Sequence, residues 1–189
     1  MPHEYPPNPT QWPYERNALD LRRDLQLAAE DRLSVRASYS LLRGATVQPH
    51  GDCGCAQVYI DSFRGPLRET WSACALEVGD DVVVLYNDSH SPERTRASLM
   101  EEYFHLRLGH RPTTIRVHDG RPKRNFSGNA ETAAYHSGAA ALVPYGGLRL
   151  AIDQGLTVPA IAIRYQVSRA LVVFRAKVTK QYRRLQRAS

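Results

Sequence analysis

The strongest structural signal in the sequence is a helix with a clear start and a clear stop near the middle of the chain. Ser91 can cap the first turn, Pro92 suits the first helical position, and Gly109 is a typical stop after the last turn. These residues predict a helix over residues 92–108. A second helix, rich in alanine, is expected over residues 130–143.

Strand-like runs precede the first of these helices. Residues 56–60, 70–78 and 82–86 are rich in side chains that favour strands, and residues 79–81 suit a hairpin turn between the last two runs. The runs predict a small, mostly antiparallel sheet. Because this sheet is combined with helices, the sequence indicates an α+β fold.

Further helical segments are expected at both ends of the chain. Apolar residues recur at broadly helical spacing over residues 14–33, and residues 37–42 suit a short helix. Residues 158–165 and 169–185 predict two helices separated by a short turn, with Ser168 as the N-cap of the second. This last pair has helix-turn-helix character.

Composition divides the chain into parts. Residues 1–13 contain five prolines and predict an extended, poorly ordered arm, whereas residues 14–189 are long enough for a single domain with its own core. Residues 154–189 predict a basic helical segment, because eight Lys and Arg residues and no acidic residue follow Asp153. This segment suggests an acidic partner, either nucleic acid or an acidic protein surface, with a solvated basic helix face as the alternative.

The sequence also bears on the compartment. No run approaches the ~18–20 apolar residues that cross a bilayer, and the first residues lack the basic start and apolar stretch of a secretory signal. Cys53, Cys55 and Cys74 cannot all pair internally, and one residue between Cys53 and Cys55 is fewer than zinc knuckles use. We therefore expect reduced thiols in a cytoplasmic protein without a membrane span.

Three polar side chains on the predicted 92–108 helix form the chemically most informative group. Glu101 and Glu102 precede His105 by four and three positions, so all three side chains project over neighbouring parts of one helix surface. Such side chains can converge on one metal ion, although similar pairs also occur by chance on surface helices. The context strengthens the metal hypothesis, because Glu131 begins the second helix and a zinc peptidase presents its ligands in this order.

Several segments of the chain resemble the ImmA/IrrE family of metallopeptidases. The resemblance rests on residues 81–87, 94–100, 101–110, 131–144 and 165–175, and it covers roughly residues 80–176. It implies a zincin-like fold, in which the sheet packs on an active-site helix and on a second helix that carries a glutamate.

The family's pattern is His-Glu-x-x-His, completed by a glutamate from the second helix. The resemblance therefore implies that Glu102 is the catalytic base, that His105 and Glu131 are metal ligands, and that the cofactor is Zn²⁺. This chain departs from the pattern because Glu101 stands at the position of the first histidine ligand.

The carboxylate of Glu101 changes the expected chemistry. Two carboxylates and one imidazole leave Zn²⁺ less able to acidify a bound water than two imidazoles and one carboxylate, and an oxygen-rich site favours Mn²⁺ or Fe²⁺ more strongly. His110, just after the helix stop, either joins the site or faces solvent. Tyr135 or His136 on the second helix either donates a hydrogen bond to a developing oxyanion or packs in the core.

Two functions follow. The first is a metal-dependent, zinc endopeptidase of the ImmA/IrrE type, which by resemblance would cleave a specific intracellular protein such as a helix-turn-helix repressor and act in transcription regulation and stress response. The second is a catalytically degenerate zincin-like domain that binds protein or DNA through its basic C-terminal helices. Glu101 at a ligand position and the basic segment 154–189 motivate this second function.

Overall fold

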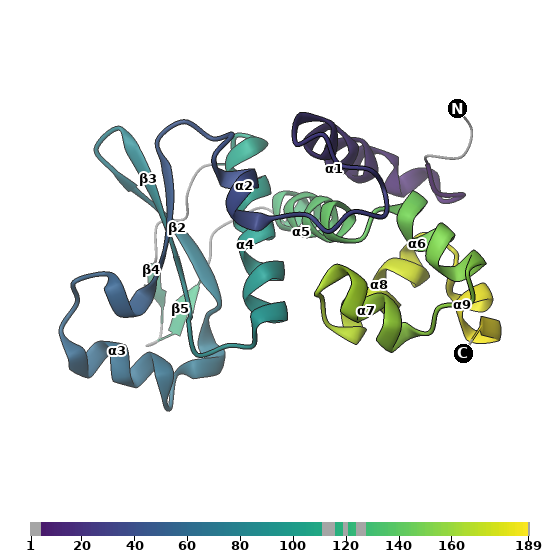
Figure 1. Ribbon diagram of the computed structural model, residues 1–189. Helices are drawn as coiled ribbons and strands as arrows, with labels where there is room; N and C mark the ends of the chain where they lie inside the picture. The colour runs from purple at the N-terminus through teal and green to yellow at the C-terminus, as the bar shows by residue number, and fades with distance from the viewer. Residues whose placement is uncertain (1–4, 111–115, 119–120, 124–127, 189) are drawn as a thin grey trace. The chain divides into compact units, whose positions relative to one another are not determined.

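The computed structural model describes residues 5–110, 116–118, 121–123 and 128–188 (Figure 1). The chain divides into two compact units. We call Val35–Ala134 the sheet unit, and Met1–Ser34 together with Tyr135–Ser189 the helical unit. That residues 14–189 form a single domain remains a prediction.

The sheet unit contains a three-stranded sheet in the order β1-β3-β2. β2 (Ala73–Val78) and β3 (Asp81–Tyr86) form an antiparallel hairpin, and the φ of +62° at Gly79 suits the turn between them. β1 (Ala45–Pro49) runs parallel to β3, so the sheet is mixed and the prediction of a mostly antiparallel sheet is corrected. β1 was not predicted, because this strand is short, ends in proline and pairs with a strand that lies far along the chain.

The sheet unit also contains helices and a small second sheet. These elements are α2 (Val35–Tyr39), α3 (Gln57–Arg64), α4 (Pro92–Arg107), the 3-10 turns His50–Asp52 and Arg68–Thr70, and the antiparallel pair β4 (Arg116–His118) and β5 (Arg121–Lys123). The strand predicted at residues 56–60 is wrong, because α3 occupies this region. Ile60 is buried there while Val58 and Tyr59 are each 65% exposed, a one-sided pattern that suits a helix at the surface.

Helix α4 packs its apolar face on the sheet. Met100, Tyr103 and Phe104 are all 0% exposed, and α4 contacts β2, β3 and α2. The backbone N–H of Arg94 donates to the Ser91 hydroxyl at 3.3 Å, which confirms the predicted N-cap. The observed helix, Pro92–Arg107, ends one residue before the predicted end at residue 108. Because its apolar face packs on the sheet, the directions of its polar side chains are also determined.

The helical unit is built from short helices. They are α1 (Trp12–Asp24), the part of α5 (Gly128–Leu142) from Tyr135 onward, α6 (Tyr145–Asp153), α7 (Val158–Tyr165), α8 (Arg169–Val178) and α9 (Tyr182–Ala188). The structure confirms the helices predicted at residues 130–143 and 158–165. Helix α6, which follows Pro144 immediately, was not predicted.

Two predicted helices are shorter in the structure. The helix expected over residues 14–33 ends at Asp24, because Gln26 adopts a left-handed conformation with φ +56°. The helix expected over residues 169–185 is broken in a similar way, because Lys180 has φ +58° and α8 and α9 are separate helices on either side. In both places a residue other than glycine adopts the left-handed conformation in which glycine usually ends a helix. The sequence therefore lacked the glycine that commonly indicates a helix end.

A buried ion pair lies in the core of the helical unit. Arg175 of α8 donates to the Glu15 carboxylate of α1 at 2.5 Å, and both side chains are fully buried. Arg175 also donates to the carbonyl oxygen of Val143, and the second oxygen of Glu15 accepts from the backbone N–H of Tyr145. Arg175, one of the eight basic residues of the C-terminal segment, is therefore buried in the core.

The described part of the N-terminal segment is not simply extended. Pro9–Gln11 forms a 3-10 turn that leads directly into α1, and Gln11 is buried and lies 2.9 Å from the ring of His136. The proline-rich arm expected over residues 1–13 is thus replaced by helical backbone from residue 9. Among the described residues, no helix combines the length and the apolar character needed to cross a bilayer.

Candidate metal centre

Helix α4 presents Glu101 and His105 on one face, because residues four positions apart lie one turn apart on a helix. Glu131 reaches the same place from the first turn of α5. The ligand atoms of these three side chains all lie within 4.8 Å of one another. The structure therefore brings together the three residues that the sequence analysis nominated as metal ligands.

The spacing of these atoms is close to that of a metal site. Nε2 of His105 lies 3.8 Å from Oε2 of Glu131. Two ligands bound ~2.0–2.1 Å from one tetrahedral ion lie about 3.4 Å apart. The separation of His105 and Glu131 is thus only slightly longer than the separation expected of two ligands of one ion.

The surroundings of the group also fit a cation. His105 is 1% exposed, whereas Glu101 and Glu131 are half-buried. Oε1 of Glu131 is buried and accepts no hydrogen bond from the residues that the structure describes. A buried carboxylate oxygen without a donor is unfavourable unless a cation compensates it, and two carboxylates with one imidazole are suitable donors for Zn²⁺, Mn²⁺ or Fe²⁺. These residues fit a divalent metal ion.

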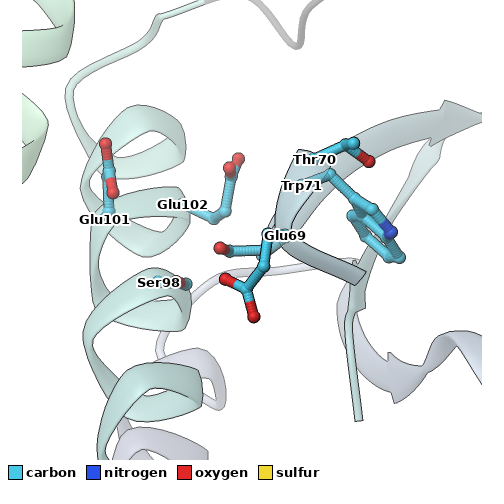
Figure 2. Close-up of a pocket in the computed structure, with 8 residues that line it drawn as sticks. Glu69, Thr70, Trp71, Ser98, Glu101 and Glu102 are labelled. Atoms are coloured by element: carbon cyan, nitrogen blue, oxygen red, sulfur yellow. The ribbon is translucent and has the colours of Figure 1, made fainter. Parts of the chain in front are cut away.

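Glu102 lies beside this group and is not part of it. Its side chain is 4% exposed and, in Figure 2, projects from α4 toward the segment that carries Thr70 and Trp71. There it lines a cleft of about 240 Å³. The cleft is lined by Glu69, Thr70, Trp71, Ser72, Ala73, Ser98, Glu101 and Glu102. Because Glu101 belongs to both the cleft and the candidate metal group, the cleft adjoins that group.

Charged and polar groups shape the cleft and its surroundings. Glu69 forms an ion pair with Arg94, whose guanidinium also donates to the Ser72 hydroxyl at 3.1 Å. Burial and then the negative charge of Glu102 raise the pKa of Tyr39 well above its usual range. Tyr39 itself donates to the carbonyl oxygen of Leu99. Glu102 therefore acts electrostatically on a poorly hydrated part of the sheet unit.

Comparison with protein families agrees with this geometry. The family described as the IrrE N-terminal-like domain, Peptidase_M78, matches residues 61–177, which is more than half of the chain. The chain belongs to this family. The resemblance stated from the sequence is thereby confirmed. No curated protein and no solved structure matches the chain.

The match of the IrrE N-terminal-like domain spans the β2-β3 hairpin, α4, α5 and α8. It includes all four residues nominated from the sequence, namely Glu101, Glu102, His105 and Glu131. Glu101, which by the sequence resemblance stands where the family's pattern has its first histidine, lies in the same group as His105. Position 101 therefore contributes a carboxylate oxygen beside the imidazole of His105.

His110 does not join the three-residue group. Its Nδ1 lies 3.1 Å from Nδ1 of His105, whereas the other ring nitrogen of His105, Nε2, faces Glu131. His110 is also half-buried. The sequence left two alternatives for His110, an additional metal ligand or a solvent-facing residue at the helix end. The structure supports neither alternative.

The two aromatic candidates on α5 have packing contacts in the helical unit. The ring of Tyr135 lies 5.1 Å from that of Phe174, and His136 contacts the same ring. His136 also pairs with Gln11, and burial followed by the charge of Arg175 lowers the pKa of its imidazole. These contacts support packing rather than catalysis for Tyr135 and His136.

Sequence reasoning missed the wall of the cleft formed by residues 69–73. The sequence predicts a strand over part of this segment, and no spacing of residues in the sequence relates the segment to α4. Only the packing of β2 against α4 identifies it. The hairpin predicted over residues 70–86 was the closest sequence signal. It indicated a strand near α4, but it did not indicate which residues of that strand would face Glu102.

Proposed function

We propose that this chain is a metal-dependent endopeptidase that uses Zn²⁺, with Mn²⁺ or Fe²⁺ as alternatives, on a zincin-like architecture. The observation that carries the proposal is the convergence of Glu101, His105 and Glu131, with Glu102 buried in the adjoining cleft. Membership of a peptidase family supports the same reaction class.

In this proposal three side chains bind the metal and a fourth transfers protons. Glu101, His105 and Glu131 would hold the metal, which when bound polarises the scissile carbonyl and lowers the pKa of a water molecule. Glu102 then acts as general base, taking a proton from the attacking water and delivering it to the leaving amine. Its low exposure supports this role, because bulk water has little access to compete for the proton.

The proposed substrate is a specific protein such as a helix-turn-helix transcriptional repressor, as the family resemblance implies. Cleavage would then act in transcription regulation and stress response. A cytoplasmic location is part of this proposal. The free thiols of Cys53 and Cys55 support it, because reduced thiols are typical of cytosolic proteins.

Metal analysis and proteolysis on the full chain test the proposal together. The parent protein should carry one equivalent of metal and cut members of a peptide library, with cleavage followed by mass spectrometry. Glu102→Gln should keep the metal and lose cleavage, whereas His105→Ala should lose both. Glu77→Gln, the same change at an exposed position of β2, is the matched control and should behave as the parent.

Two outcomes would contradict the proposal. A parent protein that binds none of the three metals would favour the degenerate module. Cleavage by Glu102→Gln at the parent rate would remove Glu102 from the catalytic assignment.

A binding module is the second candidate, and the exposed basic side chains of α8 and α9 favour it. Arg169, Lys177, Arg183 and Arg187 are exposed, whereas Arg184 forms an ion pair with Asp153. Such a surface could contact phosphates or an acidic protein. Binding to duplex DNA that weakens steeply with salt would support the nucleic-acid version, and no binding at low salt would exclude it.

A further inference from the structure

The end of helix α4 has a specific backbone geometry. Gly109 adopts the left-handed conformation with φ +70°, and its N–H donates to the carbonyl oxygen of Leu106 at 3.1 Å. The N–H of His110 donates to the carbonyl oxygen of His105 at 2.8 Å. These two hydrogen bonds form a Schellman motif, which turns the chain back over the last helical turn. The motif therefore places residue 110 directly beside residue 105.

The side chains of the two histidines meet as a result. Their Nδ1 atoms lie 3.1 Å apart, and the rings are 5.1 Å apart at an angle of 67°. The Nε2 atom of His105 points the other way and lies 3.8 Å from Glu131. The two nitrogens of the buried His105 ring thus face different partners, one in the candidate metal group and one on His110.

The chemistry of imidazole links these two contacts. A neutral ring carries one N–H, so His105 can bind a cation through Nε2 only when its proton is on Nδ1. That N–H then requires an acceptor, because a buried donor without a partner is costly. Nδ1 of His110 is at hydrogen-bond distance and accepts when His110 carries its own proton on Nε2. The two rings therefore fix each other's tautomer.

We propose that His110 is a positioning residue, which accepts a hydrogen bond from Nδ1 of His105 and holds the lone pair of Nε2 toward Glu101 and Glu131. This role rests on the proposed metal site. It requires neither direct contact of His110 with the metal nor movement of the helix end. Gly109 contributes indirectly, because its left-handed backbone delivers His110 to this position.

The test compares two substitutions at position 110 by metal affinity. The full-length, metal-free protein is titrated with Zn²⁺ and separately with Co²⁺ by calorimetry. His110→Leu removes the acceptor, and we expect a roughly 10- to 100-fold weaker affinity, the usual effect of losing a partner of a metal-binding histidine. His110→Asn offers an amide oxygen near the place of Nδ1, and its affinity should stay within about threefold of the parent value. Circular dichroism and the thermal midpoint check that both variants fold.

Gly109→Ala tests the backbone part of the inference. A Cβ at this position would meet no atom within 4 Å, so the change strains the backbone without creating a clash. We expect a weaker metal affinity although neither histidine is altered. Nitrogen-15 spectra of the zinc-loaded parent should show His105 protonated at Nδ1 and His110 protonated at Nε2.

The outcomes separate this inference from the proposed function. A parent protein that binds none of Zn²⁺, Co²⁺, Mn²⁺ and Fe²⁺ overturns the metal site and the positioning role together. If the parent binds metal and His110→Leu binds it equally well, only the positioning role fails. It also fails if His110→Asn loses as much affinity as His110→Leu, or if the spectra place the His105 proton on Nε2.

Discussion

Nε2 of His105 lies 3.8 Å from Oε2 of Glu131, so the last turns of α4 and the first turn of α5 meet at one point. Glu131→Gln keeps the size of the side chain and removes its charge. Because a lost ligand should cost at least as much as a lost ligand partner, we expect metal affinity to fall by about 10- to 100-fold or more. Zinc titration by calorimetry measures it, and an unchanged affinity would remove Glu131 from the ligand set.

Glu101→His should restore the His-Glu-x-x-His pattern of the family. An added imidazole and one fewer carboxylate shift the donor set toward nitrogen, so the variant should prefer Zn²⁺ over Mn²⁺ more strongly than the parent does. Competition between the two ions at equal concentration, followed by metal analysis, gives the ratio. A ratio equal to that of the parent would show that the side chain at position 101 does not contact the metal.

The buried and exposed ion pairs of the helical unit should differ in their effect on stability. Arg175→Met leaves Glu15 buried without its charged partner, and we expect the free energy of unfolding to fall by about 3–5 kcal/mol. Arg184→Met removes the same kind of group from a pair with Asp153 that is nearly half exposed, and should cost about 1 kcal/mol or less. Urea denaturation measures both, and equal losses would contradict the comparison.

Two adjacent glycines of α6 offer a matched pair for packing. A Cβ at Gly147 would overlap the carbonyl oxygen of Ala29 and the hydroxyl of Tyr165, so Gly147→Ala should destabilise the protein by about 1–3 kcal/mol or more. A Cβ at Gly146 meets only the Ala29 side chain at an ordinary 3.5 Å. Gly146→Ala should therefore be neutral or stabilising by up to about 1 kcal/mol. Thermal unfolding of both variants checks the order, and a reversed order would refute the close approach at residue 147.

The carboxylate of Asp88 should make the stability of the sheet unit depend on pH. The hydrogen bond from Arg64, followed by the nearby charge of His50, lowers the pKa of Asp88 in the folded state. A depressed carboxyl pKa contributes stability that is present above the unfolded value of about 3.9 and is lost as the pH falls through the folded value. The stability difference between the parent and Asp88→Asn should therefore be largest near neutral pH and shrink below pH ~4. Denaturation curves across this range measure it, and a difference that is constant with pH would contradict it.

Parts of the fold could be predicted because their signals are local. Ser91, Pro92 and Gly109 define α4 through hydrogen bonds within one or two turns, and Gly79 marks the β2-β3 hairpin in the same way. The parallel strand β1 has no such signal, because its partner β3 lies far along the chain and pairing depends on the whole sheet. The helix ends at Gln26 and Lys180 also escaped prediction, since neither residue is a glycine.

The candidate site shows the same division. The sequence by itself determined that Glu101 and His105 share a helix face, because helical geometry fixes residues four apart, and the family pattern nominated Glu102 and Glu131. Tertiary structure decided that Glu131 lies within reach of His105, that residues 69–73 form a wall beside Glu102, and that Nδ1 of His105 faces His110 rather than the metal group. These relationships depend on how apolar surfaces pack and on which way each side chain then points, and no local spacing encodes them.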